Sequence, residues 1–127
     1  MLSHARILLV ENEPLLALEL AQTIAEANGT VAATARSREE ALQLAITSEI
    51  NCAVLDVKLS DGKSFAVARL LAERGIPFLF CTGDIADQQQ FSDWPGVPVI
   101  GKPYKTETMI IEISSLLQGQ QLHSKAG

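Results

Sequence analysis

The sequence predicts an α/β fold in which a five-stranded parallel sheet is covered by helices on both faces. Short apolar runs closed by turn residues are typical of buried strands. Five such runs alternate with segments of helical spacing, and this alternation is typical of doubly wound parallel sheets. The 127 residues fit one domain over 1–127, with a core at about 5–118 and a flexible polar tail at 119–127.

The composition is that of a globular protein, with 47% hydrophobic and 20% charged residues. The formal net charge is -5 and Lys and Arg do not cluster, which argues against nucleic acid as a direct partner. No apolar run approaches the roughly 18 residues that a membrane span needs. The N-terminus also lacks a signal-peptide pattern. We therefore expect a cytoplasmic protein that contacts neither nucleic acid nor membrane.

The five strands are expected at residues 6–10, 30–35, 52–56, 77–82 and 97–101. Proline opens the fourth strand at Pro77, a position where strands tolerate it. Pro98 lies within the fifth strand, which suggests that this strand forms an edge of the sheet.

The helices have recognisable ends. The first should begin at Pro14, because proline is tolerated in a first turn, and should end at Asn28-Gly29 with Gly29 in the left-handed conformation. Ser37 and Glu40 form a capping box at the start of the second. The remaining helices are expected at about 64–74 and over the apolar stripe of Met109, Ile110, Ile113, Leu116 and Leu117.

Residues 83–96 do not form a clear amphipathic stripe. Their apolar residues are spaced irregularly around Gln88–Gln90. We expect a short or irregular fourth helix, or a mobile loop.

Cys52 and Cys81 both fall within expected strands. If these strands are parallel neighbours, the two residues are about 13 Å apart along the strand direction at about 3.3 Å per residue, too far for a disulfide. We expect two buried thiols, with a redox role as the alternative.

Polar residues follow four of the strands where they end. Glu11-Asn12 follows the first, Asp56 ends the third, Thr82-Gly83 ends the fourth and Lys102-Pro103 follows the fifth. Parallel strands place these ends along one edge of the sheet. Carboxylate and carbonyl oxygens suit Mg²⁺, and a carboxylate beside Mg²⁺ and a lysine is suited to accept a phosphoryl group.

These motifs, in this order, resemble the receiver domain of two-component response regulators, the CheY-like, flavodoxin-like fold. The resemblance rests on Leu8–Pro14, Asp56 with Leu59–Gly62, Thr82-Gly83 and Lys102–Tyr104, and it covers about residues 5–118. It implies the strand order 2-1-3-4-5.

The resemblance also implies a role for each site residue. Asp56 matches the phosphoacceptor, Thr82 the hydroxyl that bonds the phosphoryl oxygen, and Lys102 the lysine beside them, whose bond to Pro103 is typically cis. The implied Mg²⁺ ligands are Glu11, Asn12, Asp56 and the backbone carbonyl of Lys58.

Residues 77–83 and 98–104 are similar to an alphaproteobacterial receiver subfamily named for a Phe-Ala-Thr-Gly-Tyr motif, whose members have a reduced or mobile fourth helix. Asp84 replaces the tyrosine of that motif. By family position, Lys58 and Asp84 flank the phosphorylation site. We hypothesise that they pair across it and slow hydrolysis of the acyl phosphate.

Two residues depart from the family pattern. Most receivers have aspartate where this chain has Asn12, so we expect weaker Mg²⁺ binding through one amide oxygen; alternatively, Asn12 only caps the first helix. Many receivers carry an aromatic residue where this chain has Val99, so the usual threonine–aromatic coupling is in doubt and the signal is expected to pass through residues 83–94 instead.

The resemblance implies a stand-alone response regulator that takes a phosphoryl group from a sensor histidine kinase or a histidine phosphotransfer protein and acts on a downstream protein target. It would catalyse only its own phosphorylation and dephosphorylation. Receivers commonly form homodimers through the last helix and the fifth strand, but no residue here compels it. The alternatives are a pseudo-receiver that binds partners without phosphorylation and, less favoured, a nucleotide-binding α/β protein, which would need a glycine-rich loop after the first strand.

Overall fold

A computed structural model describes residues 1–126, with side chains described to residue 119. Its elements follow the expected alternation of strands and helices. They are β1 (Arg6–Val10), α1 (Pro14–Glu26), β2 (Thr30–Ala35), α2 (Arg38–Thr47), β3 (Cys52–Asp56), β4 (Lys58–Leu59), β5 (Gly62–Lys63), α3 (Phe65–Glu73), β6 (Phe78–Thr82), the 3-10 turn η1 (Gln88–Phe91), β7 (Val99–Gly101) and α4 (Thr106–Ala126).

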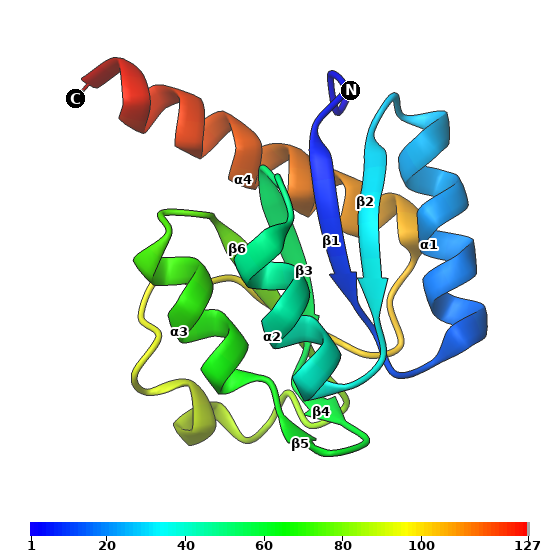
Figure 1. The fold of residues 1–127 in the computed structure, drawn as a ribbon, viewed down its shortest axis with the longest axis vertical. Coiled ribbons are helices and arrows are strands. Elements are labelled where there is room, and N and C mark those ends of the chain that lie inside the picture. Colours follow the sequence, from blue (N-terminus) through cyan, green and yellow to red (C-terminus); the bar gives the residue numbers. More distant parts are fainter. Residues whose placement is uncertain (127) are drawn as a thin grey trace.

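The main sheet has five parallel strands in the order β2-β1-β3-β6-β7. Because β6 and β7 are the fourth and fifth strands of this sheet along the chain, the predicted order 2-1-3-4-5 is confirmed. Helices α2 and α3 cover one face and α1 and α4 the other (Figure 1). Strand β7 lies at an edge, as expected, but it begins at Val99, so Pro98 precedes the strand and does not lie within it.

Alternate residues of the buried strands supply two separate cores. On β1, Leu8 and Val10 face α2 and α3, whereas Ile7 and Leu9 face α1 and α4. The central strands β3 and β6 are buried along their whole length. Burial on both faces explains why these strands are continuous apolar runs in the sequence.

The first helix ends differently from the prediction. Asn28, not Gly29, takes the left-handed conformation, with a φ of 70°. At position 29, glycine is instead required because the surrounding side chains leave no room for a Cβ atom. A Cβ at that position would lie 2.8 Å from side-chain atoms of both Ile24 and Leu2.

Two further elements differ from the prediction. Residues 58–63 form a small antiparallel hairpin, β4–β5, that the sequence did not indicate. Helix α4 continues to Ala126, so the expected flexible tail is helical up to that residue, and Gly127 lies outside the described residues. Gln, Leu, Lys and Ala have high intrinsic helix propensities, which accounts for the extension.

The segment between β6 and β7 holds only the four-residue turn η1, as expected of a short or irregular fourth helix. Phe91 and Trp94 fix it to the sheet and to α3. Their rings meet those of Phe78 and Phe80 in β6 and of Phe65 in α3 at centroid distances of 5.3–6.1 Å. Aromatic packing therefore positions this segment in place of a regular helix.

The cysteines behave as predicted. Cys81 pairs in register with Asp56, four residues beyond Cys52 on the neighbouring strand. Both thiols are free and buried, and burial raises the pKa of Cys52 to about 12. None of the described helices is long and apolar enough to span a membrane.

Candidate functional site

Four strand ends bring the predicted site residues together. Asp56 is the last residue of β3 and Thr82 the last of β6, while Glu11 and Lys102 directly follow β1 and β7. Backbone bonds hold the ends in register. The Lys102 amide donates to the Thr82 carbonyl over 2.8 Å, and the Glu11 amide donates to the Ala35 carbonyl over 3.0 Å.

The Lys102 ammonium joins three carboxylates at this edge. Its Nζ donates to Glu11 Oε2 at 2.7 Å, to Asp56 Oδ2 at 3.0 Å and, more weakly, to Glu13 Oε1 at 3.4 Å. Glu11 and Asp56 are each only 4% exposed. Lys102 therefore offsets much of the repulsion between two buried carboxylates, which explains why this lysine points inward.

Burial and pairing shift the proton affinities of this cluster. Burial raises the pKa of Glu11 to about 7, against the opposing effect of its hydrogen bonds from Lys102 and the Glu13 amide. For Lys102, burial favours the neutral amine, but hydrogen bonds to Glu11 and Asp56 outweigh it and raise the pKa. The lysine stays protonated at neutral pH, while Glu11 lies close to its titration midpoint.

The backbone of Asn12 lies beside Asp56. Its amide donates to Asp56 Oδ2 at 3.3 Å, and its side chain is exposed. The N-cap residue of α1 is Glu13, and that position has no side-chain cap bond. The alternative that Asn12 caps the first helix is therefore wrong, because Asn12 lies one residue before the cap.

The donor set at this edge fits Mg²⁺. It offers the buried carboxylates of Glu11 and Asp56, with the amide oxygen of Asn12 and the carbonyl of Lys58 close by in sequence, and Mg²⁺ is commonly held by one or two carboxylates and water. The side chains described include no group of three or more Asp, Glu, His or Cys residues arranged to hold a metal. The Lys58 carbonyl as a ligand stays a prediction.

Thr82 lies buried at the floor of the site, with 5% exposure. Its Oγ1 accepts a hydrogen bond from the Asp84 amide at 3.0 Å. The Thr82 hydroxyl donates no hydrogen bond among the described residues, so its proton can still form one. At the position on β7 where many receivers have an aromatic residue, this chain has Val99. Its side chain is half-buried against the core that contains the aromatic cluster.

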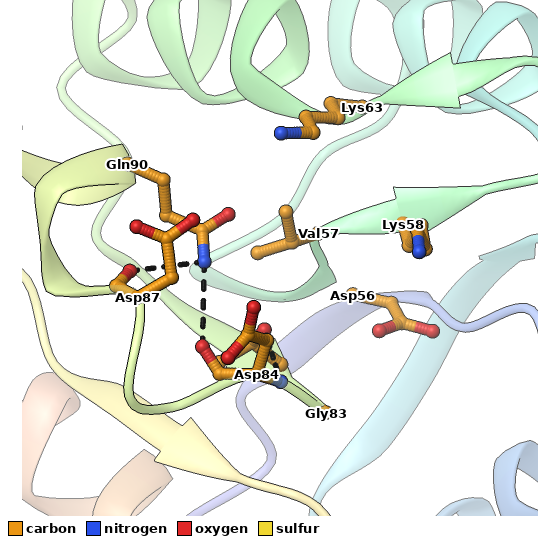
Figure 2. Close-up of a pocket in the computed structure, with 9 residues that line it drawn as sticks. Asp56, Val57, Lys58, Lys63, Gly83, Asp84, Asp87 and Gln90 are labelled. Atoms are coloured by element: carbon orange, nitrogen blue, oxygen red, sulfur yellow. Dashed lines mark hydrogen bonds between the residues drawn. The ribbon is translucent and has the colours of Figure 1, made fainter.

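A cavity of about 310 Å³ opens beside Asp56 (Figure 2). The β4–β5 hairpin forms one wall with Lys58 and Lys63, and the segment after β6 forms the other with Asp84, Asp87 and Gln90. No ion pair joins Lys58 to Asp84 within the described part of the chain. Sequence reasoning missed Lys63, Asp87 and Gln90, because only the unpredicted hairpin and the turn η1 bring them to the cavity.

The hairpin is fixed to α2 by Asp61, a residue of the Leu59–Gly62 motif to which the sequence assigned no role of its own. Its carboxylate accepts hydrogen bonds from the backbone amides of Arg38 and Glu39 at 2.5 and 3.1 Å. These bonds hold the pKa of Asp61 below its ordinary value. The first turn of α2 is thus capped by a residue from the hairpin that follows β3.

Comparisons with known proteins agree with this fold. SdrG from Sphingomonas melonis Fr1 is 34% identical over 92% of this chain and 99% of its own, with a TM-score of 0.76. A CheY-like receiver protein from Methanospirillum hungatei JF-1 has 23% identity, coverage of 95% and 99%, and a TM-score of 0.84. The response regulator PhyR from Brucella abortus has 24% identity and a TM-score of 0.82 over 96% of this chain, which spans about half (51%) of PhyR.

The two matches below 25% identity show the fold alone, whereas the likeness to SdrG extends to the sequence. The comparison with curated protein sequences found no match. A model of the response regulator receiver domain family matches residues 7–114, most of the chain. The peptide bond between Lys102 and Pro103 is cis, as that resemblance implied. The chain therefore belongs to the response regulator receiver domain family.

Proposed function

We propose that this chain is a single-domain response regulator that accepts a phosphoryl group on Asp56 in a two-component phosphorelay. One observation carries the proposal. The Lys102 ammonium lies 3.0 Å from the Asp56 carboxylate and 2.7 Å from Glu11, at the edge where four parallel strands end. A buried carboxylate with a cation beside it and a hydroxyl near by is the arrangement that phosphoryl transfer to a carboxylate needs.

The chemical step is a displacement at phosphorus. A bond forms between an Asp56 carboxylate oxygen and phosphorus while the bond from phosphorus to the donor breaks, and the donor leaves as a free imidazole or carboxylate. Mg²⁺, when bound, would neutralise the charge on the phosphoryl oxygens. Lys102 supplies a fixed positive charge at the same place, and Thr82 donates its hydroxyl proton to a phosphoryl oxygen.

The partners are a sensor histidine kinase or a histidine phosphotransfer protein and a downstream protein target, with a cytoplasmic location. Exposed apolar side chains on α1 support a protein donor. Leu15 is 82% and Leu18 68% exposed, and Leu15 is four residues from Glu11. They would give a phosphodonor protein an apolar contact beside the pocket. In this proposal the chain turns over no external metabolite.

The alternative function is a pseudo-receiver that binds partners without phosphorylation. Asn12 favours it, because the site has one carboxylate fewer than most receivers. The bonds from Lys102 to both buried carboxylates favour phosphorylation instead, since they hold a positive charge where a phosphoryl group on Asp56 would lie.

The narrower assignment, to the alphaproteobacterial Phe-Ala-Thr-Gly-Tyr-motif subfamily, is also a proposal. Phe80, Thr82 and Gly83 match the motif, and Cys81 and Asp84 do not. The replacement of a regular fourth helix by η1 supports it.

Incubation with acetyl phosphate and Mg²⁺, followed by mass spectrometry, tests the proposed function. The wild type should gain one phosphoryl group, and Asp56→Ala should gain none. Beryllofluoride with Mg²⁺ provides a second test, because it should shift the amide resonances of Thr82 and Gly83. Absence of both responses would favour the pseudo-receiver.

A further inference from the structure

The two lysines of the β4–β5 hairpin occupy an unfavourable arrangement. Lys58 and Lys63 are cross-strand partners in the register of the hairpin. Like charges directly opposite each other destabilise a strand pair, and neither ammonium has a carboxylate partner among the described side chains. In this conformation, no described carboxylate therefore neutralises the positive charge of either lysine.

The hairpin that carries them is held in place. Its turn residue Asp61 bonds to two backbone amides of α2, and the Ser64 amide donates to the Val57 carbonyl at 2.9 Å. The side chain of Lys63 extends over the cavity toward the opposite wall (Figure 2). The hairpin therefore holds the positive charge of Lys63 in a fixed position, where it can attract the opposite wall if that wall is displaced.

The opposite wall carries negative charge, and hydrogen bonds join its residues to one another. Asp84 and Asp87 are exposed and face the same cavity as the lysines. The Gln90 side-chain amide donates to the carbonyls of Asp84 and Asp87 at 3.4 and 3.1 Å, and the Asp87 amide donates to the Asp84 carbonyl at 3.2 Å. A displacement of Asp84 would therefore carry Asp87 with it.

Thr82 connects this wall to the phosphorylation site. Its Oγ1 accepts from the Asp84 amide, so movement of the hydroxyl toward a phosphoryl group on Asp56 draws Asp84 in the same direction. Because Gln90 ties Asp87 to Asp84, the acidic wall as a whole approaches the hairpin.

We propose that Lys63 and Asp87 form a latch that closes over phosphorylated Asp56 and slows its hydrolysis. The inference rests on the proposed function. In hydrolysis, a water oxygen bonds to phosphorus, the bond from phosphorus to the Asp56 oxygen breaks, and phosphate, a free carboxylate and a proton are released. A closed Lys63–Asp87 pair narrows the route by which water enters the cavity. Both residues act through access to the site and are positioning residues.

The phosphoryl half-life tests the latch. After phosphorylation with acetyl phosphate and removal of the donor, Lys63→Ala and Asp87→Ala should each shorten the half-life by about twofold to fivefold, the effect of one partly exposed ion pair. The double alanine variant should lose no more than either single variant. The exchange of charges in Lys63→Glu with Asp87→Lys should restore most of the half-life.

Matched controls come from exposed charges elsewhere. Arg69→Ala removes a cation from α3 and Asp93→Ala removes an acid from the same segment as Asp87, and neither residue lines the cavity. Both should leave the half-life unchanged. High salt should shorten the wild-type half-life and leave that of Lys63→Ala unaffected.

The possible failures are distinguishable. If wild-type Asp56 takes no phosphoryl group, the proposed function fails and the latch fails with it. If Asp56 is phosphorylated but the alanine variants keep the wild-type half-life, only the latch is overturned. Additive losses in the double variant, or no recovery in the charge exchange, would also overturn it.

Discussion

Replacement of Asn12 by aspartate restores the charge that most receivers have at this position. Asn12 directly follows the buried Glu11, and its own side chain is exposed, so water sets the dielectric around a new carboxylate. In water, two unit charges about 4 Å apart interact by about 1 kcal/mol, and a divalent ion doubles this to about 2 kcal/mol. At 1.4 kcal/mol for each factor of ten, Asn12→Asp should bind Mg²⁺ about 30-fold more tightly than the wild type.

The assay is a Mg²⁺ titration at constant ionic strength, followed by the fluorescence of Trp94 or by amide chemical shifts. Trp94 is the one tryptophan of the sequence, and its ring lies 5.9 Å from that of Phe80, two residues before Thr82. Asn12→Ala is the matched control. It removes the amide oxygen without adding charge and should bind more weakly than the wild type. Equal affinities in the wild type and Asn12→Asp would show that the charge at this position does not contribute to Mg²⁺ binding.

Three further predictions concern the metal site, the proposed docking helix and the aromatic cluster. Mg²⁺ affinity should rise about tenfold from about pH 6 to about pH 8, because Glu11 with a pKa of about 7 ionises over this range; a flat profile in isothermal titration calorimetry would contradict it. Leu15→Asp should slow phosphoryl transfer from a phosphotransfer protein but not from acetyl phosphate. If the variant and the wild type react at the same rate with the phosphotransfer protein, or if both donors are slowed equally, the result would count against docking on α1. Phe91→Ala should lower the free energy of unfolding in urea by about 3–5 kcal/mol, because this ring is buried against Phe65 and Phe80; a loss below about 1 kcal/mol would show that the cluster does not hold the segment.

Much of the fold and the outline of the site were predictable because their signals are local or follow from topology. Continuous apolar runs such as Leu8–Val10 and Cys52–Leu55 indicate buried strands without reference to the rest of the chain. Once the strands are parallel, their carboxyl ends must share one edge. Asp56, Thr82 and Lys102 therefore had to lie near one another, although they are far apart in sequence.

The features that were not predicted depend on contacts between distant segments. The β4–β5 hairpin has two residues in each strand, too few for a periodic pattern. Asp61 caps a helix that begins 23 residues before it in the chain, and no rule of sequence spacing indicates that pairing. Gly29 was assigned a left-handed backbone, but its role is to admit Ile24 and Leu2, which only tertiary packing determines.

Intact mass spectrometry after incubation with acetyl phosphate tests the claim that Asp56 accepts a phosphoryl group with the help of Mg²⁺. The proposed function predicts one added phosphoryl group in the wild type, none in Asp56→Ala, and none in either protein when EDTA removes the metal. Peptide mapping should place the group on Asp56. An unmodified wild type, or equal modification of wild type and Asp56→Ala, would contradict the claim.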